Sequence, residues 1–344
     1  MFKEIFDFVI NTPGCSDLHL SSTNYPMVRV SGVLYPMKNM PKLDAPTVNR
    51  FIQGILNEHQ YKEFQNNNEV DFALNLEGGH RFRANVFKKH NGPAVALRPI
   101  SKKTKTLSEI NAPGVLKELL EKRKGLIVVS GPTGCGKSTT LSAMINHINE
   151  HHATNIITIE DPIEHLHQSK KSLISHREIG THSNSFANAL RAALREDPDI
   201  ILVGEMRDLE TISLALTAAE TGHLVLTTLH TSSAANAVSR IIDVFHASEQ
   251  QVVRTMLANS LNAVVLQHLL PSVDEEKKIE AAFEVLIANS SIRNMIREDK
   301  LAQINSMMEI GQKHGMITFK DSVESMLERG SISEKTALEF LRKF

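Results

Sequence analysis

Gly131-Pro132-Thr133-Gly134-Cys135-Gly136-Lys137-Ser138-Thr139 is the stretch that decides the fold of this 344-residue chain. It follows the apolar run 126–129 and precedes a segment, 139–149, with helical spacing. It fits the pattern G-x-x-x-x-G-K-[ST], whose glycines let backbone N–H groups and a helix N-terminus surround an anion. In this pattern Lys137 reaches the β and γ phosphates and Ser138 is a ligand of Mg²⁺. We therefore predict a phosphate-binding loop over residues 131–139.

Apolar runs like the one before the loop recur at 156–159, 200–203 and 224–226. Helical spacing of apolar residues lies between them, over residues 186–194. Strands that are apolar on both faces and joined by helices predict a parallel sheet covered on both sides. After about residue 290 the pattern is helical only. We expect an α/β domain at 109–290 and a C-terminal helical region at 291–344.

The first 100 residues have a different pattern, in which short helices alternate with strands. Three β-rich runs, at 70–76, 81–87 and 94–100, are separated by good turn sequences. They predict an antiparallel meander within a small α+β domain at 1–100. The polar residues that follow lack apolar periodicity, and we expect a linker at 101–108.

Composition excludes several classes of protein. The chain has 38 Lys and Arg against 39 Asp and Glu, so its net charge of -1 supplies no global field for nucleic acid. Cys15 and Cys135 are too few for a disulfide framework or a four-cysteine zinc site. Charged residues interrupt the apolar start, and polar residues interrupt the charge-free stretch 255–273. We interpret the chain as a cytoplasmic protein of two or three domains.

Carboxylates follow two of the predicted strands, where open α/β sheets bind ligands. Glu205 comes after 200–203, in a position suited to support Mg²⁺ beside a phosphate-binding loop. Glu160, Asp161 and Glu164 follow 156–159, and one of these three carboxylates could orient or deprotonate an attacking water. An ordinary polar loop remains the alternative for this second group, and a solvated strand end remains the alternative for Glu205.

Two histidines bracket the run 224–229. His223 and His230 are seven residues apart, so in a regular strand their side chains point to opposite faces and cannot easily share a metal. His230, at the carboxyl end, is the better placed to sense a γ phosphate. A histidine that only satisfies backbone groups is the alternative for either one.

These motifs together resemble the secretion ATPases of the type II secretion and type IV pilus superfamily. The resemblance is closest to the retraction ATPases of type IV pili, the PilT family. It rests on residues 131–139, 159–164, 195–208 and 221–231, and on Ser291–Glu298, which looks like the Ala-Ile-Arg-Asn-Leu-Ile-Arg-Glu segment of retraction ATPases. Cys135 departs from the Ser that is common at its position in the loop.

The resemblance implies a PAS-like N-terminal domain, a RecA-like ATPase domain and a homohexamer that binds ATP and Mg²⁺ between neighbouring domains. By the same resemblance Glu164 is similar to the catalytic base and Glu205 to the Walker B glutamate. Arg83 and Arg98 match arginines that act like arginine fingers, although exposed strand arginines are the alternative. Arg240 resembles an interface arginine.

The function implied is that of an ATP-hydrolysing motor that drives pilus retraction and twitching motility. Its partner would be an inner-membrane platform protein at the cytoplasmic face of the membrane, with or without a second, paralogous ATPase. The alternatives are a pilus assembly or type II secretion ATPase and a RecA-type nucleic-acid translocase. Assembly ATPases usually carry a four-cysteine zinc element, so the two cysteines favour retraction.

Overall fold

The structure is a computed structural model that describes residues 1–100, 104–274 and 278–342. The chain divides into two compact units, Met1–Lys103 and Thr104–Phe344. Residues 101–103 of the predicted linker lie outside the described residues. In the rest of that segment, Leu107 is buried in an apolar cluster of the second unit. Residues 104–108, expected in the linker, therefore belong to the second unit.

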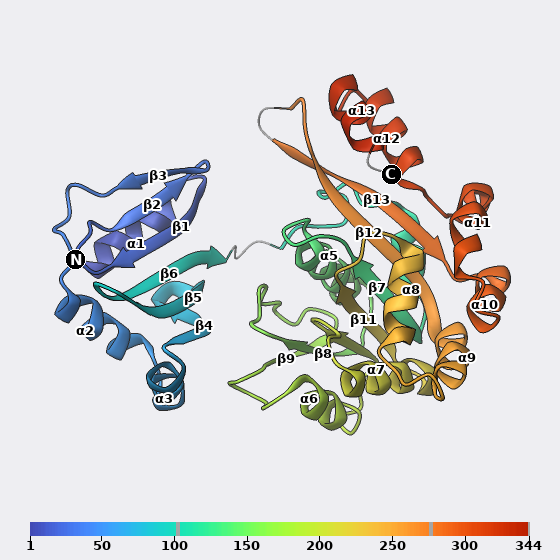
Figure 1. Cartoon of the computed structure of the whole chain (residues 1–344), viewed down its shortest axis with the longest axis horizontal. Helices are drawn as coiled ribbons and strands as arrows, with labels where there is room; N and C mark the ends of the chain where they lie inside the picture. The colour runs from blue at the N-terminus through green and yellow to red at the C-terminus, as the bar shows by residue number, and fades with distance from the viewer. Residues whose placement is uncertain (101–103, 275–277, 343–344) are drawn as a thin grey trace. The chain divides into compact units, whose positions relative to one another are not determined.

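The first unit is a six-stranded sheet in the order β3-β2-β1-β6-β5-β4, with every neighbouring pair antiparallel (Figure 1). The runs predicted at 70–76, 81–87 and 94–100 are β4, β5 and β6, so the predicted meander is confirmed. The elements are α1 (Phe2–Asn11), β1 (Cys15–Ser21), β2 (Met27–Val30), β3 (Val33–Pro36), α2 (Ala45–Ile55), α3 (Glu58–Asn67), β4 (Glu69–Leu76), β5 (His80–Lys89) and β6 (Gly92–Ile100).

Alternation along the meander builds the core of this unit. Phe72 and Leu74 of β4 are buried together with Phe82 and Ala84 of β5, and the residues between them are less buried. Side chains two apart share one face of a strand, so this face packs against the helices while the other stays accessible. Both Arg83 and Arg98 are exposed, and they lie opposite each other on β5 and β6.

The second unit holds a seven-stranded sheet in the order β13-β12-β7-β11-β10-β8-β9 (Figure 1). The neighbours from β12 to β9 are parallel, and β13 runs antiparallel to β12 at the edge. The strands are β7 (Gly125–Ser130), β8 (Asn155–Glu160), β9 (Leu173–Glu178), β10 (Ile200–Val203), β11 (Leu224–Leu229), β12 (Leu261–Pro271) and β13 (Ile279–Ile287).

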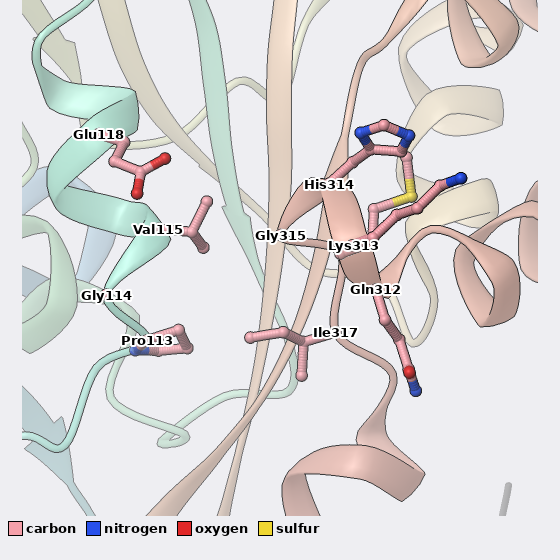
Figure 2. Close-up of a pocket in the computed structure, with 10 residues that line it drawn as sticks. Pro113, Gly114, Val115, Glu118, Gln312, Lys313, His314, Gly315 and Ile317 are labelled. Carbon is pink, nitrogen blue, oxygen red and sulfur yellow. The ribbon is translucent and has the colours of Figure 1, made fainter.

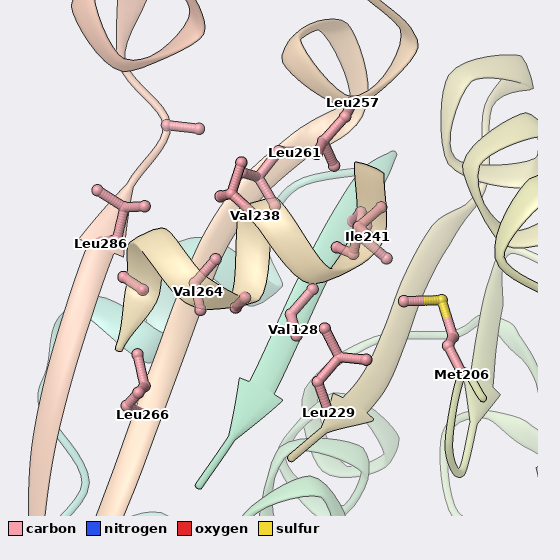
Figure 3. Close-up of a cluster of buried hydrophobic side chains, with 14 of the residues drawn as sticks. Val128, Met206, Leu229, Val238, Ile241, Leu257, Leu261, Val264, Leu266 and Leu286 are labelled. Carbon is pink, nitrogen blue, oxygen red and sulfur yellow. The ribbon is translucent and has the colours of Figure 1, made fainter. Parts of the chain in front are cut away.

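Apolar residues of β7 alternate between two separate cores. Val128 packs in a cluster with Val238 and Ile241 of α8, as Figure 3 shows. Ile127 belongs to the opposite cluster, with Leu141 of α5. The predicted parallel sheet covered on both faces is therefore confirmed. The helices are α4 (Val115–Leu120), α5 (Lys137–His151), α6 (Phe186–Ala193), α7 (Leu209–Thr221), α8 (Ala234–Asp243), α9 (Gln250–Ser260), α10 (Ser290–Arg297), α11 (Ile304–Ile310), α12 (Phe319–Glu328) and α13 (Glu334–Leu341).

The C-terminal helices pack on the same sheet. Ile292 and Ile296 of α10 and Phe319 of α12 share the cluster that contains Val128. In the described part of the region expected at 291–344, the regular elements are helices, and they are continuous with the core of the second unit. Among the helices of the described residues, none combines the length and apolar character needed to span a membrane.

Candidate active site

The phosphate-binding loop joins β7 to α5 at the carboxyl edge of the sheet. Gly131, Gly134 and Gly136 have φ values of 143°, 80° and 92°, which favour glycine. A Cβ on Gly131 would lie 2.4 Å from the carbonyl oxygen of Gln267, and one on Gly136 would lie 2.9 Å from the Gln267 Nε2 atom. The loop is therefore pressed directly onto β12, and side chains at these two positions would displace it.

Lys137 is the first residue of α5 and is only 8% exposed. Its Nζ atom donates to the carbonyl oxygens of Gly131 at 2.9 Å and Pro132 at 3.0 Å. It also lies 3.4 Å from Nδ1 of His230. Burial lowers the pKa of Lys137, and nearby Cys135, Glu205 and Glu164 act in the opposite direction. The ammonium group is thus held at the helix N-terminus, within the field of two carboxylates.

Glu205 lies just past the end of β10, between two basic side chains. One of its oxygens is 2.7 Å from an Arg207 guanidinium nitrogen, and the other is 3.5 Å from Nε2 of His230. The hydrogen bond with Glu205 raises the pKa of Arg207. Arg207 received no role from the sequence, although it lies only two residues after Glu205. The structure adds it to the site because its partner is the site carboxylate.

His230 connects the lysine to the carboxylate. Its Nδ1 faces the Lys137 ammonium, which can only donate, so the geometry assigns the ring proton to Nε2, toward Glu205. Burial, followed by the charge of Lys137, lowers the pKa of His230. The neighbouring Thr231 amide donates to the Ser130 hydroxyl at 3.0 Å, which fixes this segment to the end of β7.

Glu160 is the last residue of β8 and Glu164 lies in the segment that follows, and the structure distinguishes these two candidate bases. Glu164 acts electrostatically on Lys137, whereas Glu160 lies with its Oε1 atom 3.7 Å from Nδ1 of His176 on β9. The backbone N–H of Ile163 donates to a Glu178 carboxylate oxygen at 3.0 Å. Glu164 and Glu205 both act on Lys137, and His230 lies beside Lys137 and Glu205. The structure therefore brings these four side chains together.

Gln267 is a supporting residue that sequence reasoning missed. Its Oε1 atom accepts a hydrogen bond of 2.6 Å from the hydroxyl of Thr140, and both side chains are buried. Thr140 lies in the first turn of α5, so Gln267 supports both the loop and the helix that follows it. The sequence does contain a sign of this role, because Gln267 is a polar residue within the charge-free stretch 255–273.

The remaining predicted residues have partners or positions of their own. Arg83 and Arg98 belong to the first unit, and Arg98 donates through Nε and Nη2 to Asp17 Oδ1 at 3.1 and 2.9 Å. Arg240 is exposed on α8. His223 lies before β11, at the edge opposite His230, and its Nδ1 is 3.0 Å from the carbonyl oxygen of Ala218. For His223 the structure favours the backbone-satisfying alternative.

The segment Ser291–Glu298 is mostly α10, and its two arginines have definite partners. Arg293 donates to the carbonyl oxygens of Ala258, Asn259 and Ala288, the latter two at 2.8 and 2.9 Å. Arg297 donates to the side-chain oxygen of Asn259 at 3.0 Å. These contacts cap the carboxyl end of α9 and fasten α10 to it, because that end presents unpaired carbonyl groups.

Cys135 lies under the loop and is 4% exposed. Burial raises the pKa of its thiol, which reduces the thiolate population that reacts with oxidants. The buried position argues against easy oxidation at this point of the loop.

A surface pocket of about 570 Å³ lies away from these residues, between α4 and the segment Gln312–Ile317. Figure 2 shows Pro113, Val115 and Glu118 on one side of it and Gln312 and Ile317 on the other. None of the predicted site residues lines it.

Comparison with known proteins agrees with this geometry. The family model described as "Type II/IV secretion system protein" matches residues 15–334. The chain is 52% identical to the twitching motility protein of Neisseria gonorrhoeae, over 91% of this chain and 83% of that protein. It is 47% identical to the type IV pilus retractation ATPase PilT of Pseudomonas aeruginosa, over 95% and 94%.

A crystal structure of the pilus retraction motor PilT with bound ADP superposes with a TM-score of 0.90. It is 42% identical and covers 98% of this chain and 95% of that one. The match therefore includes both units and the phosphate-binding loop, and the predicted order of an α+β domain followed by a P-loop ATPase domain is confirmed. The chain belongs to the type II/IV secretion system protein family, and within it to the PilT-like ATPases.

Proposed function

We propose that this chain is a cytoplasmic motor that hydrolyses ATP to power the retraction of type IV pili. The observation that carries the proposal is the position of Lys137, whose Nζ lies 3.4 Å from His230 and within the field of Glu164 and Glu205. The names of the relatives, a twitching motility protein and a pilus retraction motor, support the same activity.

In this proposal the loop residues 131–139 bind the phosphates of ATP. The amides at the N-terminus of α5 and the Lys137 ammonium supply positive charge there. The Ser138 hydroxyl and the Glu205 carboxylate are hard oxygen groups that suit Mg²⁺. Within the described residues no group of three or more His, Cys, Asp or Glu could hold a metal. When bound, Mg²⁺ neutralises charge on the β and γ oxygens.

Hydrolysis needs a base to orient the attacking water and accept its proton. Glu164 suits that role because its charge acts on Lys137, whereas Glu160 faces His176. His230, whose Nδ1 lies 3.4 Å from Lys137 Nζ, would sense the γ phosphate beside the lysine. Arg83 and Arg98 would supply charge to the phosphates as arginine fingers within a homohexamer, in which Arg240 lies at an interface. For Arg98 that role requires release from Asp17.

The motor would act on pilin through an inner-membrane platform protein, at the cytoplasmic face of the membrane. A second, paralogous ATPase would either act together with this motor in retraction or not be needed for it. No nucleic-acid partner is proposed, because a net charge of -1 supplies no field to attract one.

A cell whose only copy carries Lys137→Ala tests this function. We expect no retraction and an excess of surface pili, together with loss of ATP hydrolysis by the purified protein. Normal retraction in that strain would overturn the proposal. Absence of pili in a deletion strain would instead indicate an assembly ATPase, and salt-sensitive ATP hydrolysis stimulated by DNA would indicate a nucleic-acid translocase.

A further inference from the structure

Glu284 is a carboxylate on an apolar face of β13, and the proposed mechanism does not use it. Side chains two apart share one face of a strand, so Ala282 and Leu286 flank it. Both are fully buried, in the cluster that also contains Val238 of α8 (Figure 3). A carboxylate on such a face is costly unless hydrogen bonds satisfy it. The partners of Glu284 therefore indicate why it lies at this position.

The first partner of Glu284 is the amino end of α8. The backbone N–H of Ala234, the first residue of this helix, donates to Glu284 Oε1 at 3.3 Å. Ser233, the residue before the helix, accepts the backbone N–H of Asn236 with its hydroxyl at 3.2 Å. The first N–H groups of a helix have no partners within it, and each of these two side chains satisfies one of them. Glu284 thus fixes the point at which α8 begins.

The second partner of Glu284 is the amino end of α12. Burial raises the pKa of Glu284, and hydrogen bonds from the backbone amides of Ala234 and Phe319 act in the opposite direction. Phe319 is the first residue of α12. Two residues earlier, Ile317 pairs with Val285 of β13 through backbone hydrogen bonds of 2.8 and 3.0 Å. One carboxylate therefore joins the starts of two helices, whose partial positive charge suits it.

The register of the sheet places Glu284 level with the active site. Glu284 lies opposite Leu266 on β12, and Leu266 lies opposite Ser130 on β7. Ser130 in turn lies opposite Leu229, the last residue of β11. His230 directly follows Leu229, so it leaves the sheet at the end of the row of residues that begins with Glu284.

The segment 230–233 is fixed at two points along this row. Near its start, the backbone N–H of Thr231 donates to the Ser130 hydroxyl at 3.0 Å. Just after its end, the backbone N–H of Ala234 donates to Glu284. Ser130 and Glu284 are two strand spacings apart, which is about 10 Å. The contact with Glu284 therefore sets the direction in which the segment leaves β11.

We propose that Glu284 is a positioning residue, which fixes the amino end of α8 against α12 and thereby holds His230 beside Lys137. The inference rests on the proposed role of His230 in ATP hydrolysis. A group displaced by about 1 Å from its reactive geometry can lower a rate by up to about a hundredfold. Because Glu284 acts on His230 through the backbone, its loss should lower turnover and leave the affinity for ATP nearly unchanged.

The test compares Glu284→Gln and Glu284→Leu in the full chain, by steady-state ATP hydrolysis. Glutamine retains an acceptor oxygen and should keep kcat within about twofold of the parent. Leucine suits the apolar face but accepts no hydrogen bond, so we expect it to lower kcat about fivefold with KM for ATP nearly unchanged. The inference is overturned if Glu284→Leu, folded by its thermal transition, has the parental kcat, or if both variants lose turnover equally.

A double variant shows whether Glu284 acts through His230. His230→Leu removes the ring that Glu284 would position, so adding Glu284→Leu to it should lower kcat no further. A residue that only stabilises the fold would reduce turnover independently of His230. Two losses that multiply in the double variant would therefore overturn the inference.

Asp321→Leu is the matched control, because Asp321 also supports the start of α12. Its carboxylate accepts the Thr318 backbone N–H at 2.9 Å and the Gln312 side-chain amide at 2.7 Å, both in the C-terminal region. The variant should lower the midpoint of thermal unfolding by about 3 °C and retain the parental kcat. A loss of turnover equal to that of Glu284→Leu would show that loosening α12 is sufficient, and would overturn the inference.

The NMR signals of the His230 ring nitrogens give a readout that does not depend on ATP hydrolysis. At about pH 8 they should show the proton on Nε2 in the parent and in Glu284→Gln. In Glu284→Leu they should move toward a mixture of the two tautomers, as the contact of Nδ1 with Lys137 weakens. Parental signals in Glu284→Leu would overturn the inference. If the parent does not hydrolyse ATP but the signals show the expected difference, the proposed function fails and the positioning role of Glu284 stands.

Discussion

The two edges of the parallel sheet in the second unit use the same kinds of residue in different ways. At the carboxyl edge, Lys137, His230 and Glu205 face one another as side chains. At the amino edge, Asp199 accepts the backbone N–H of Asn155 at 2.8 Å, and His223 lies 3.0 Å from the carbonyl oxygen of Ala218. Carboxylates and histidines occur at both edges, so residue type alone does not distinguish a reactive site from a structural one.

The difference lies in the partners. Side chains at the amino edge satisfy backbone groups at the ends of strands and helices, which would otherwise be unpaired. At the carboxyl edge the charged groups act on one another: Glu205 raises the pKa of Arg207, and the charge of Lys137 adds to burial in lowering the pKa of His230. Substitutions should therefore change stability at one edge and turnover at the other.

The strongest test of this division uses two lysines. Burial lowers the pKa of both Lys137 and Lys122, but Lys122 lies before β7, at the amino edge, and donates to Asn262 Oδ1 at 3.4 Å. Lys137→Ala should lower ATP hydrolysis about a thousandfold, because it removes a positive charge aimed at the phosphates.

Lys122→Ala should leave kcat within about twofold and should lower the free energy of unfolding by about 1 kcal/mol. Steady-state assays and urea unfolding measure both. A comparable loss of turnover in the two variants would remove the functional distinction between the edges.

Substitutions of Glu164 and Glu160 test whether two neighbouring carboxylates differ in their effect on turnover. Glu164→Gln should lower kcat about a hundredfold with little change in ADP affinity, because a base acts on the attacking water and not on nucleotide binding. Glu160→Gln should cost less than about tenfold. The reverse order in single-turnover hydrolysis would transfer the proposed role to Glu160.

Substitution of Gln267 tests whether a buried residue beneath the phosphate-binding loop contributes to the stability of the fold. Gln267→Leu leaves the buried Thr140 hydroxyl without its acceptor and should lower the free energy of unfolding by about 2 kcal/mol. Adding Thr140→Val removes the orphaned hydroxyl, so the double variant should regain part of that loss. Urea unfolding of the four proteins measures the coupling, and strictly additive effects would contradict it.

The smallest effects should come from the two histidines that bracket β11. His223→Leu should lower the free energy of unfolding by about 1 kcal/mol, the value of one hydrogen bond, and leave kcat unchanged. His230→Leu should show the opposite pattern, with about a tenfold lower kcat and nearly parental stability. A loss of turnover in His223→Leu would show that the amino edge also influences catalysis.

Much of the fold could be predicted because its central strands are apolar on both faces. The runs that became β7, β8, β10 and β11 are buried throughout or nearly so, and a parallel sheet covered by helices hides both faces of such strands. The edge strand β9 has the sequence Leu-Ile-Ser-His-Arg-Glu and lacks that signal, because one of its sides is unpaired. β12 was missed since Asn262 and Gln267 interrupt its apolar pattern.

In the site, too, the residues that could be predicted are those with a clear local sequence pattern. The residues of the loop are adjacent in sequence, and Glu205 and His230 directly follow strands, so local pattern was enough to find them. Gln267 was not found, because its importance depends on a hydrogen bond to Thr140, which no local spacing reveals. Local sequence pattern located the charged side chains of the site, whereas the structure was needed to find the residue that supports them.

The strand that lies beneath the loop has a mechanical consequence. β12 begins at Leu261, directly after the α9 end that Arg293 caps, and six residues later it contacts the loop through Gln267. Hydrogen bonds to β7 and β13 pair it on its two sides. From Leu261 to Gln267 it spans about 20 Å, so a single strand connects the phosphate-binding loop with the end of α9 to which α10 is fastened.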